Sequence, residues 1–525
     1  MNGLPSRYPE FSSMTAFIRK YWNEQPLLLI MLLGIFFRLL AAIFARGWGM
    51  IDDHFLVIES AQSWVDGSDY NSWLPGSPGN SGPTGHNFFY PGLHFILFSF
   101  FKIIHLNDPQ MKMFLVRLIN GSWSLITIYF GYKITERLSD KRSARIVGLL
   151  LAILWFMPWV SVRDLVEVSC LPLLILAVWF IVSRGDQSGQ TSAYFLAGLF
   201  LGLAFDLRPQ TIFFSFGLIL AVLIERRWKE AFTLIIGAFI PVLLIQGLVD
   251  YFIWGRPFVE VAAYVKGNIK SAQDYITLPW YNYFLVVFGM LIPPVSLMLS
   301  FGFVRSWRRY FLIFIPVVIF FIFHSWFPNK QERFILPILP FIIITGVIGW
   351  NEFIDRSGFW MRNKKLLRGS WIFFWILNIA LLIPVTVVYS KRARVEAMVY
   401  LSRYKEVKYL LVADDHDNPE LFPRFYLRQW PGMYDEYIGS ENTAALIERV
   451  SRYPEKIHPR FIFFTGSELK PETIIRARKS FPFLVYETTI EPGLVDKVMH
   501  RLNPINVSRR VFIYRNKALV PDKAP

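Results

Sequence analysis

The sequence predicts a polytopic α-helical membrane protein that ends in a small soluble α/β domain. Of the 525 residues, 54% are hydrophobic and only 18% are charged. Apolar runs of about 20 residues, the length that crosses a hydrocarbon core roughly 30 Å thick, recur as far as residue 390. The rest of the chain is polar and carries short runs typical of strands.

The membrane-embedded part, residues 1–390, is expected to contain about eleven transmembrane helices. The first apolar run is too long for the core of a signal peptide and no small-residue cleavage pattern follows it, so we expect it to remain as a transmembrane helix. The candidate spans are 26–46, 113–132, 144–161, 167–183, 193–206, 209–225, 230–250, 281–301, 310–326, 333–350 and 371–389.

The basic residues, which give a formal net charge of +16, indicate topology rather than a nucleic-acid surface. They form short clusters between apolar runs, as the positive-inside rule expects of cytoplasmic loops. The run 90–106 has about the minimum spanning length. If it stays on the surface, the later basic clusters share one side with the amino terminus, so we expect an interfacial or re-entrant helix there.

Residues 391–525 are expected to fold as a soluble α/β domain on the non-cytoplasmic side. Four β-like runs, VKYLLVAD, RFIFFTG, FPFLVYE and RRVFIYR, are separated by possible helices and by Pro/Gly turns. The segment is long enough for a core of its own. The single cysteine, Cys170, excludes an intramolecular disulfide.

The first external loop, 47–112, places acidic residues next to the membrane. No Lys or Arg occurs between Gly47 and Phe89. Helical spacing predicts an interfacial helix with one apolar stripe on lipid and one acidic stripe on display. The apolar stripe is Ile51, Phe55, Ile58 and Val65, and the acidic stripe is Asp52, Glu59 and Asp66. Such acids can also simply solvate the helix or complement its dipole.

Three further polar stretches lie at membrane edges on the same expected side. They are DLRPQT with Arg208, VDYFIWGRPF at 249–258, and FPNKQERFILPILPF at 327–341 with Lys330, Glu332 and Arg333. Cations at helix ends often only snorkel to the interface, so each stretch alone is weak evidence of a site.

In their order along the chain, these stretches resemble the polyprenyl-phosphate-sugar-dependent glycosyltransferases of the GT-C fold, closest to the mannosyltransferases that build glycosylphosphatidylinositol anchors and N-glycan precursors. IDDHFLVIESAQ is similar to that family's H-P-D-E-x-W-Q-x-L-E-x-A-H pattern, and NKQERFILPILP to H-K-E-E-R-F-L-L-P-I-Y-P. LRPQ and DYFIWGRPF are similar to R-x-R-P-T and D-x-F-x-Y-G-x-x-x-F. The resemblance covers about residues 25–350, and Leu56, Gln62 and Asn329 depart from it.

The resemblance implies an inverting glycosyltransferase. The enzyme would move a sugar, with mannose favoured, from a polyprenyl- or dolichyl-phosphate donor to a hydroxyl of a lipid-linked or glycan acceptor, at the periplasmic or lumenal face. It implies Asp52 or Asp53 as the base for the acceptor proton, and Asp52 is favoured because it aligns with the family's Asp. Asp53 would position the acceptor or raise its neighbour's pKa.

Arg333, Lys330 and Arg208 are the candidates for the donor phosphate, because a guanidinium suits phosphate oxygens and Lys adds a point charge. Three residues are expected to support them: Glu332 would orient Arg333 or bind sugar hydroxyls, His54 would assist the phosphate or acceptor, and Glu59 belongs to the acidic pattern.

Other functions stay open at this point. A GT-C transferase of arabinose or aminoarabinose is one alternative. A secondary transporter is disfavoured, because most charge lies at the membrane edges and no internal repeat is visible. No cofactor is implied and no metal site is evident, although a divalent ion is not excluded. The absence of cysteines from the expected external domain favours a bacterial inner membrane over the endoplasmic reticulum.

Overall fold

The computed structural model describes residues 19–184, 191–274, 276–414, 421–434, 443–503 and 509–521. By its internal contacts the chain divides into two compact units. Unit 1 comprises Met1–Ala42, Trp73–Tyr90 and Val116–Val387, and unit 2 comprises Ile43–Ser72, Pro91–Leu115 and Val388–Pro525. The last segment of unit 2 thus begins close to the boundary expected near residue 391, and most of the first loop belongs to unit 2.

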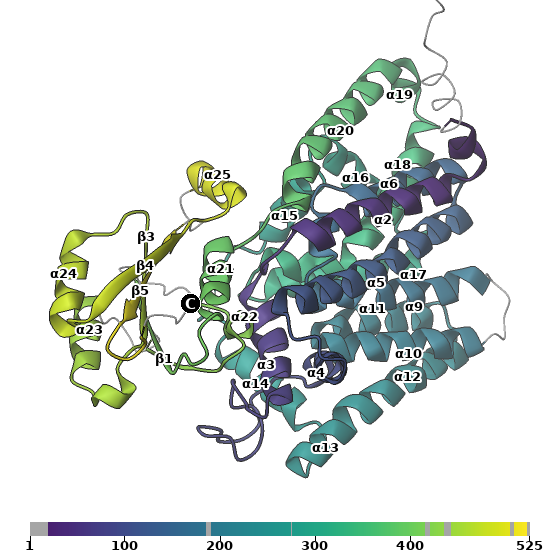
Figure 1. Ribbon diagram of the computed structural model, residues 1–525. Coiled ribbons are helices and arrows are strands. Elements are labelled where there is room, and N and C mark those ends of the chain that lie inside the picture. Colours follow the sequence, from purple (N-terminus) through teal and green to yellow (C-terminus); the bar gives the residue numbers. More distant parts are fainter. Residues whose placement is uncertain are drawn as a thin grey trace, which may run out of the picture. The chain divides into compact units, whose positions relative to one another are not determined.

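Unit 1 is built from helices (Figure 1). Its chain starts in α2 (Pro26–Phe44) and continues from the second half of α5 (Pro109–Leu138). The further elements are α6 (Lys141–Ile153), α7 (Met157–Val160), α8 (Val166–Ser169), α9 (Leu171–Arg184), α10 (Thr191–Leu207), η2 (Pro209–Thr211), α11 (Ile212–Ile224), α12 (Trp228–Pro241), η3 (Val242–Gly247), α13 (Leu248–Trp254), α14 (Val259–Lys270), α15 (Asn282–Met290), α16 (Val295–Arg305), α17 (Phe311–Trp326), η4 (Glu332–Ile338), α18 (Leu339–Ile354), α19 (Gly358–Arg362) and α20 (Lys364–Thr386).

Each expected span contains helix, and the chain is a multi-pass membrane protein. Within the described residues, six helical segments are long and apolar enough to cross a membrane: Pro26–Phe44, Pro109–Leu138, Val166–Arg184, Trp228–Trp254, Glu332–Ile354 and Lys364–Thr386. Four apolar helices are shorter: Phe89–Ile103, Thr191–Leu207, Pro209–Ile224 and Phe311–Trp326. The total of eleven crossings, and the surface position of α4 (Phe89–Ile103), stay predictions.

The span expected at 281–301 is not one straight helix. α15 and α16 are bent by 117° at the break between them. Pro293 and Pro294 lie in this break, and a proline both lacks the N–H that a continuing helix needs and clashes with the preceding turn. The pair forms either a broken span or a re-entrant loop.

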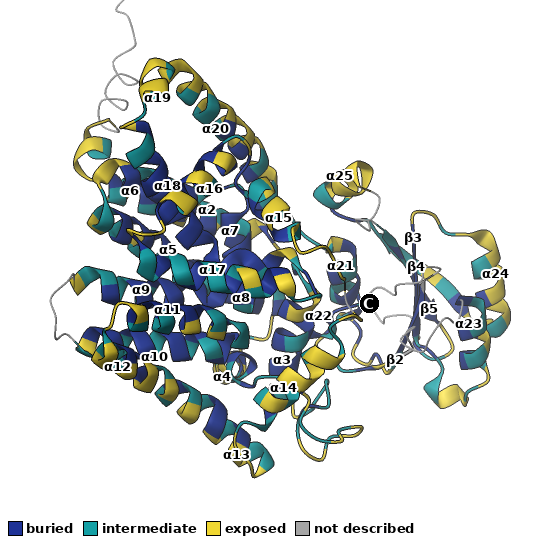
Figure 2. Cartoon of the chain, turned by 180° about the vertical axis from the view of Figure 1, so that it is seen from behind, coloured by how far each residue is buried: buried dark blue, intermediate teal, exposed yellow. Residues whose placement is uncertain are grey.

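Glycines allow two helix pairs of unit 1 to pack backbone against backbone. A Cβ at Gly198 of α10 would clash with the Leu234 carbonyl of α12, and a Cβ at Gly302 of α16 would clash with the Gly346 carbonyl of α18. Such close approaches are how small residues hold membrane helices together. α18, which continues the η4 segment, is the central helix of the unit. In the most apolar part of Glu332–Ile354, 94% of the residues are buried. The corresponding share is 17% in α20, which lies at the outside (Figure 2).

Unit 2 contains a five-stranded sheet in the order β2-β1-β3-β5-β4. The strands are β1 (Tyr409–Asp414), β2 (Gly432–Tyr434), β3 (Phe461–Gly466), β4 (Leu484–Ile490) and β5 (Arg510–Asn516). β1 pairs in parallel with β2 and β3, whereas β5 pairs antiparallel with β3 and β4. The four expected β runs are confirmed, and the short β2 was not expected.

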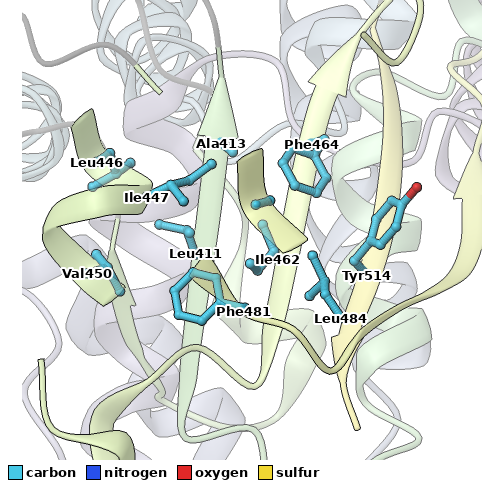
Figure 3. Packing of buried hydrophobic residues seen from close by; sticks show 11 residues of the cluster. Leu411, Ala413, Leu446, Ile447, Val450, Ile462, Phe464, Phe481, Leu484 and Tyr514 are labelled. Carbon is cyan, nitrogen blue, oxygen red and sulfur yellow. The ribbon is translucent and has the colours of Figure 1, made fainter. Parts of the chain in front are cut away.

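Helices cover this sheet because its strands alternate apolar side chains between two faces. The helices of the tail are α21 (Arg392–Leu401), α22 (Arg424–Leu427), α23 (Thr443–Ser451), the single turn η5 (Glu455–Ile457), α24 (Pro471–Ser480) and α25 (Leu494–Leu502). Leu411 and Ile462 pack against Ile447 and Val450 of α23 on one face (Figure 3). On the other face Phe461 contacts Tyr404, with ring centroids 4.8 Å apart.

The first-loop helix differs from the expected amphipathic surface helix. It begins as a π-helical segment, η1 (Asp52–Ile58), and continues as α3 (Glu59–Val65). A π-helix has more residues per turn than an α-helix, so the spacing that placed the acids on one stripe fails here. Phe55 and Ile58 are buried rather than displayed to lipid, and Glu59 is buried as well.

Candidate active site

Unit 1 brings together two of the three expected phosphate-binding cations on a carboxylate that the sequence analysis did not single out. Glu167 lies in α8, Arg208 lies between α10 and η2, and Arg333 lies in η4. One carboxylate oxygen of Glu167 is 2.5 Å from Nη1 of Arg208 and 3.3 Å from Nε of Arg333. All three side chains are buried. We call these residues the arginine cluster.

The sequence around Arg208 fixes its position. α10 ends at Leu207, and Arg208 takes an extended conformation with φ −145° and ψ 102° before Pro209 starts the next helical turn. Proline suits the first helical position because its φ is already helical and its missing N–H is not needed there. The side chain of Asn87 donates a hydrogen bond to the carbonyl of Asp206, which ties this turn to the end of the first loop.

The arginine cluster carries an excess of positive charge and spare hydrogen-bond donors. Two guanidiniums face one carboxylate, so the three side chains sum to one positive charge. Within the described residues, Nε and Nη2 of Arg208 have no hydrogen-bond partner, and neither does the second oxygen of Glu167. Both guanidiniums lie over the ring of Phe334, at 4.9 and 5.5 Å from its centroid. Buried donors of this kind suit an anionic ligand.

Lys330 and Glu332, from the same basic turn, have different surroundings. The Lys330 ammonium donates to the carbonyls of His324, Ser325 and Phe327 and so caps the end of α17. An ammonium has only three donors, and these contacts occupy them. Burial lowers the pKa of Lys330 below its usual value. Glu332 is exposed, whereas Arg333 contacts Glu167.

Asp250, in the stretch VDYFIWGRPF, belongs to a chain of hydrogen bonds that connects η3, α14 and the first loop. The Asp250 carboxylate accepts hydrogen bonds from the side chain of Gln246 and from the backbone N–H of Glu260, at 2.9 and 3.0 Å. Glu260 in turn accepts from the N–H groups of Gly85 and His86 in the first loop, at 2.6 and 3.1 Å. Burial raises the pKa of Glu260, and these N–H groups partly offset the rise. Asp250 thus holds the start of α14, and Glu260 of α14 fixes loop 73–90.

The two adjacent acids of unit 2 differ in their surroundings. Asp53 is buried, and its carboxylate accepts hydrogen bonds from the N–H groups of Gly49 and Met50, at 3.0 and 3.1 Å. It therefore ties the start of η1 to the backbone that precedes the helix. Asp52 is exposed. Of the pair, Asp52 is the carboxylate that a substrate can reach.

His54 and Glu59, expected as supporting residues, are buried beside each other. Nε2 of His54 lies 3.7 Å from an oxygen of Glu59. Burial lowers the pKa of His54 to about 3, so its ring is neutral. Burial raises the pKa of Glu59 to about 8, although nearby N–H groups and the charge of Arg424 oppose the rise. Neither group is exposed to a substrate.

Glu167 is the residue that sequence reasoning missed. It occurs in VRDLVEVSC, a short polar interruption between two apolar runs. A carboxylate between two apolar runs indicates a functional site or an ion pair, since an acid within or beside the membrane needs a partner. Its partners, however, are 41 residues away for Arg208 and farther still for Arg333. Across the described segments, no group of three or more His, Cys, Asp or Glu side chains is placed to hold a metal ion.

Solved structures of two other proteins share this fold. ArnT from Cupriavidus metallidurans, solved bound to undecaprenyl phosphate, matches with a TM-score of 0.58 and 12% identity over 93% of this chain and 97% of that chain. The oligosaccharyltransferase of Archaeoglobus fulgidus, solved with Zn and sulfate, matches with a TM-score of 0.51 and 12% identity over 95% of this chain and 74% of its own. The GT-C fold that the sequence predicts is therefore confirmed.

The family follows from the sequence comparison. The model of the Alg9-like mannosyltransferase family matches residues 29–418, more than half of the chain, so the protein belongs to that family. The GPI alpha-1,2-mannosyltransferase 3 of Bos taurus is 23% identical over 314 residues, which cover 58% of this chain and 55% of that protein. Human alpha-1,2-mannosyltransferase ALG9 is 28% identical over 171 residues, 29% of this chain and 26% of its own. The chain thus spans about half or less of the curated relatives it matches.

Proposed function

We propose that this protein is an inverting mannosyltransferase that moves mannose from a polyprenyl- or dolichyl-phosphate carrier to a hydroxyl of a lipid-linked or glycan acceptor. Membership of the Alg9-like mannosyltransferase family supports the reaction class. The arginine cluster is the observation that carries the donor class, since two buried guanidiniums, one of them Arg208 with two nitrogens that have no partner among the described residues, suit a phosphate.

The charge change of the reaction explains why a cationic cluster is useful. A phosphate that links sugar to lipid carries one negative charge, and it gains a second when the sugar–oxygen bond breaks. Arg208 and Arg333 would stabilise that developing charge more strongly than the ground state, which lowers the barrier. Glu167 would hold the two guanidiniums in place and limit their mutual repulsion. Lys330 would add its positive charge while it caps α17.

Asp52 would act as the base. Its carboxylate would take the proton of the acceptor hydroxyl while the hydroxyl oxygen bonds to the anomeric carbon and the bond from that carbon to the phosphate oxygen breaks. The electron pair of the broken bond goes to the lipid phosphate, which leaves. One displacement of this kind inverts the anomeric configuration. Asp53 would position the helix that carries Asp52, because its carboxylate ties the start of η1 to the backbone N–H groups of Gly49 and Met50.

The proposed active face is the non-cytoplasmic one, periplasmic or lumenal. The distribution of basic clusters supports it, because the catalytic candidates lie in loops expected opposite those clusters. The bacterial inner membrane is the proposed location, with the endoplasmic reticulum as the alternative.

The test uses purified protein in lipid vesicles, incubated with polyprenyl-phosphate mannose and a panel of lipid-linked and glycan hydroxyl acceptors. We expect a mannosylated product with inverted anomeric configuration. Asp52→Asn should reduce kcat by at least a hundredfold while the KM for the donor stays within a few-fold, because a missing base slows chemistry more than binding.

Two outcomes would overturn these assignments. Near wild-type kcat in the Asp52→Asn variant removes Asp52 from the role of base. Transfer of aminoarabinose or arabinose, and not of mannose, from the same kind of carrier would replace the proposed sugar.

A further inference from the structure

Glu59, the middle acid of the first-loop stripe, is bound to the carboxyl-terminal part of unit 2. Its side chain is wholly buried, and one oxygen accepts a hydrogen bond of 3.0 Å from the backbone N–H of Phe425 in α22. Burying a carboxyl group without a hydrogen-bond partner is unfavourable, so this contact holds α22 and the first-loop helix together.

An aromatic stack joins the same two segments. The ring of His54 lies between Trp48 and Tyr426, with centroids 5.4 and 5.5 Å away and interplanar angles of 20° and 11°. Phe425 meets the His54 ring edge to face at 5.9 Å. A neutral imidazole stacks in this way without the cost of burying a charge. His54 is therefore an internal layer of the interface between α22 and η1.

A third set of contacts extends the attachment along the loop. Nε1 of Trp430 donates to the Asp66 carboxylate at 3.1 Å. The Arg424 guanidinium lies 4.7 Å from the centroid of the Tyr70 ring, and Tyr70 also contacts Trp430 at 5.5 Å. Residues 424–430 thus contact the helical segment η1–α3 near its start at His54, in its middle at Glu59, and just after its end at Asp66 and Tyr70.

We propose that the carboxyl-terminal domain positions the catalytic helix: α22 docks on η1 and α3 through Glu59 and His54, and this docking fixes the orientation of Asp52. The proposal rests on the proposed role of Asp52. Glu59, His54, Phe425 and Tyr426 are positioning residues in this account. Mannose transfer would then require the tail for the geometry of the base.

The contacts explain why positioning is needed. The helical segment consists of the π-helical η1 and the α-helical α3, which have seven residues each. A helix this short is not stable without packing. Asp53 fixes only the beginning of η1. Without α22, the buried groups from His54 to Glu59 would lose the layer that covers them, and the direction of the Asp52 carboxylate would vary. Misplacement of a catalytic group by about 1 Å can cost a hundredfold in rate.

The experiment compares three variants of the full-length protein in vesicles. Tyr426→Leu removes the stack on His54, Tyr426→Phe keeps it, and Tyr486→Leu makes the same chemical change at an exposed tyrosine of β4 that is outside α22. Hydrogen exchange of peptides within residues 48–66 and within β1, β3 and β5 measures local order. Initial rates with polyprenyl-phosphate mannose measure kcat and the donor KM.

We expect Tyr426→Leu to speed exchange in residues 48–66 at least tenfold and to lower kcat at least tenfold, with donor KM within twofold and strand exchange unchanged. Tyr426→Phe and Tyr486→Leu should match the wild type in all readouts. Unchanged exchange in residues 48–66, or faster exchange with wild-type kcat, would overturn the proposal. Strand exchange that accelerates equally would also overturn it, because α22 would then only support the fold of the domain.

The readouts separate this proposal from the proposed function. Hydrogen exchange does not depend on the reaction. A wild-type kcat in Asp52→Asn would refute the assignment of Asp52 as the base, and hydrogen exchange in residues 48–66 would still decide whether α22 orders the first-loop helix.

Discussion

Substitution of Arg208 gives the sharpest view of the arginine cluster. In Arg208→Ala the Glu167 carboxylate keeps its contact with Arg333, so the pair becomes electrically balanced and no acid is left without a cation. What is lost is one positive charge and the two nitrogens, Nε and Nη2, that have no partner among the described residues. We therefore expect a defect in donor binding rather than a collapse of the fold.

The size of the defect follows from the number of donors. A hydrogen bond to a charged group contributes about 1.5–3 kcal/mol, so the loss of one or two should weaken binding of the lipid phosphate by about 1.5–6 kcal/mol, or roughly 10- to 20,000-fold. Arg208→Lys keeps the charge but not the planar fork, and should fall between the wild type and Arg208→Ala.

The assay measures initial rates against donor concentration, together with inhibition by free polyprenyl phosphate. Arg142→Ala is the matched control, because Arg142 pairs with Asp355 at an exposed position, 3.0 Å apart. An unchanged donor KM and an unchanged inhibition constant in Arg208→Ala would refute the assignment of the phosphate to this cluster.

Three further changes test the neighbouring groups. Glu167→Ala leaves two buried guanidiniums without their carboxylate and should destabilise the protein by about 3–5 kcal/mol, seen as faster thermal inactivation; Glu167→Gln, which keeps an acceptor, should lose less, and equal losses would argue against a charge effect. Lys330→Met removes the ammonium that caps α17 and should cost about 1–3 kcal/mol of stability with a smaller rise in donor KM than Arg208→Ala; a larger rise would place Lys330 on the phosphate directly. Because the pKa of Glu59 is raised to about 8 from its ordinary 4.5, the folded state holds a proton that the unfolded state releases, so stability should fall as pH rises from 4.5 to 8, by at most about 1.4 kcal/mol per unit. Thermal inactivation followed across this pH range should show a flatter profile for Glu59→Gln; identical profiles would contradict the raised pKa.

Patterns confined to a short stretch of chain predicted much of the fold. Apolar runs located the helices, and alternating apolar runs located β1, β3, β4 and β5, because both patterns report burial at a fixed local period. The three-residue strand β2 is too short to show an alternation of apolar and polar side chains. The break between α15 and α16 was visible as two prolines, but the run around them is apolar enough to suggest one span.

The candidate site was predictable only in part. The family motifs pointed to Arg208, Arg333 and Asp52, whose roles in the reaction stay predictions. They did not reveal that Asp53 binds the backbone before η1, because that contact depends on where the chain places the N–H groups of Gly49 and Met50. The acidic stripe was wrong because a π-helical start shifts the register of every later side chain.

The amino-acid sequence by itself determined the membrane class, the GT-C resemblance and the types of residue available for chemistry, since these depend on composition and on local order along the chain. Only the tertiary structure decided which charges meet. Glu167 became the shared partner of two arginines, and Glu59 became an attachment for α22 instead of a displayed acid. The physical reason is that burial and pairing set the behaviour of a charged group, and the partners come from distant parts of the chain.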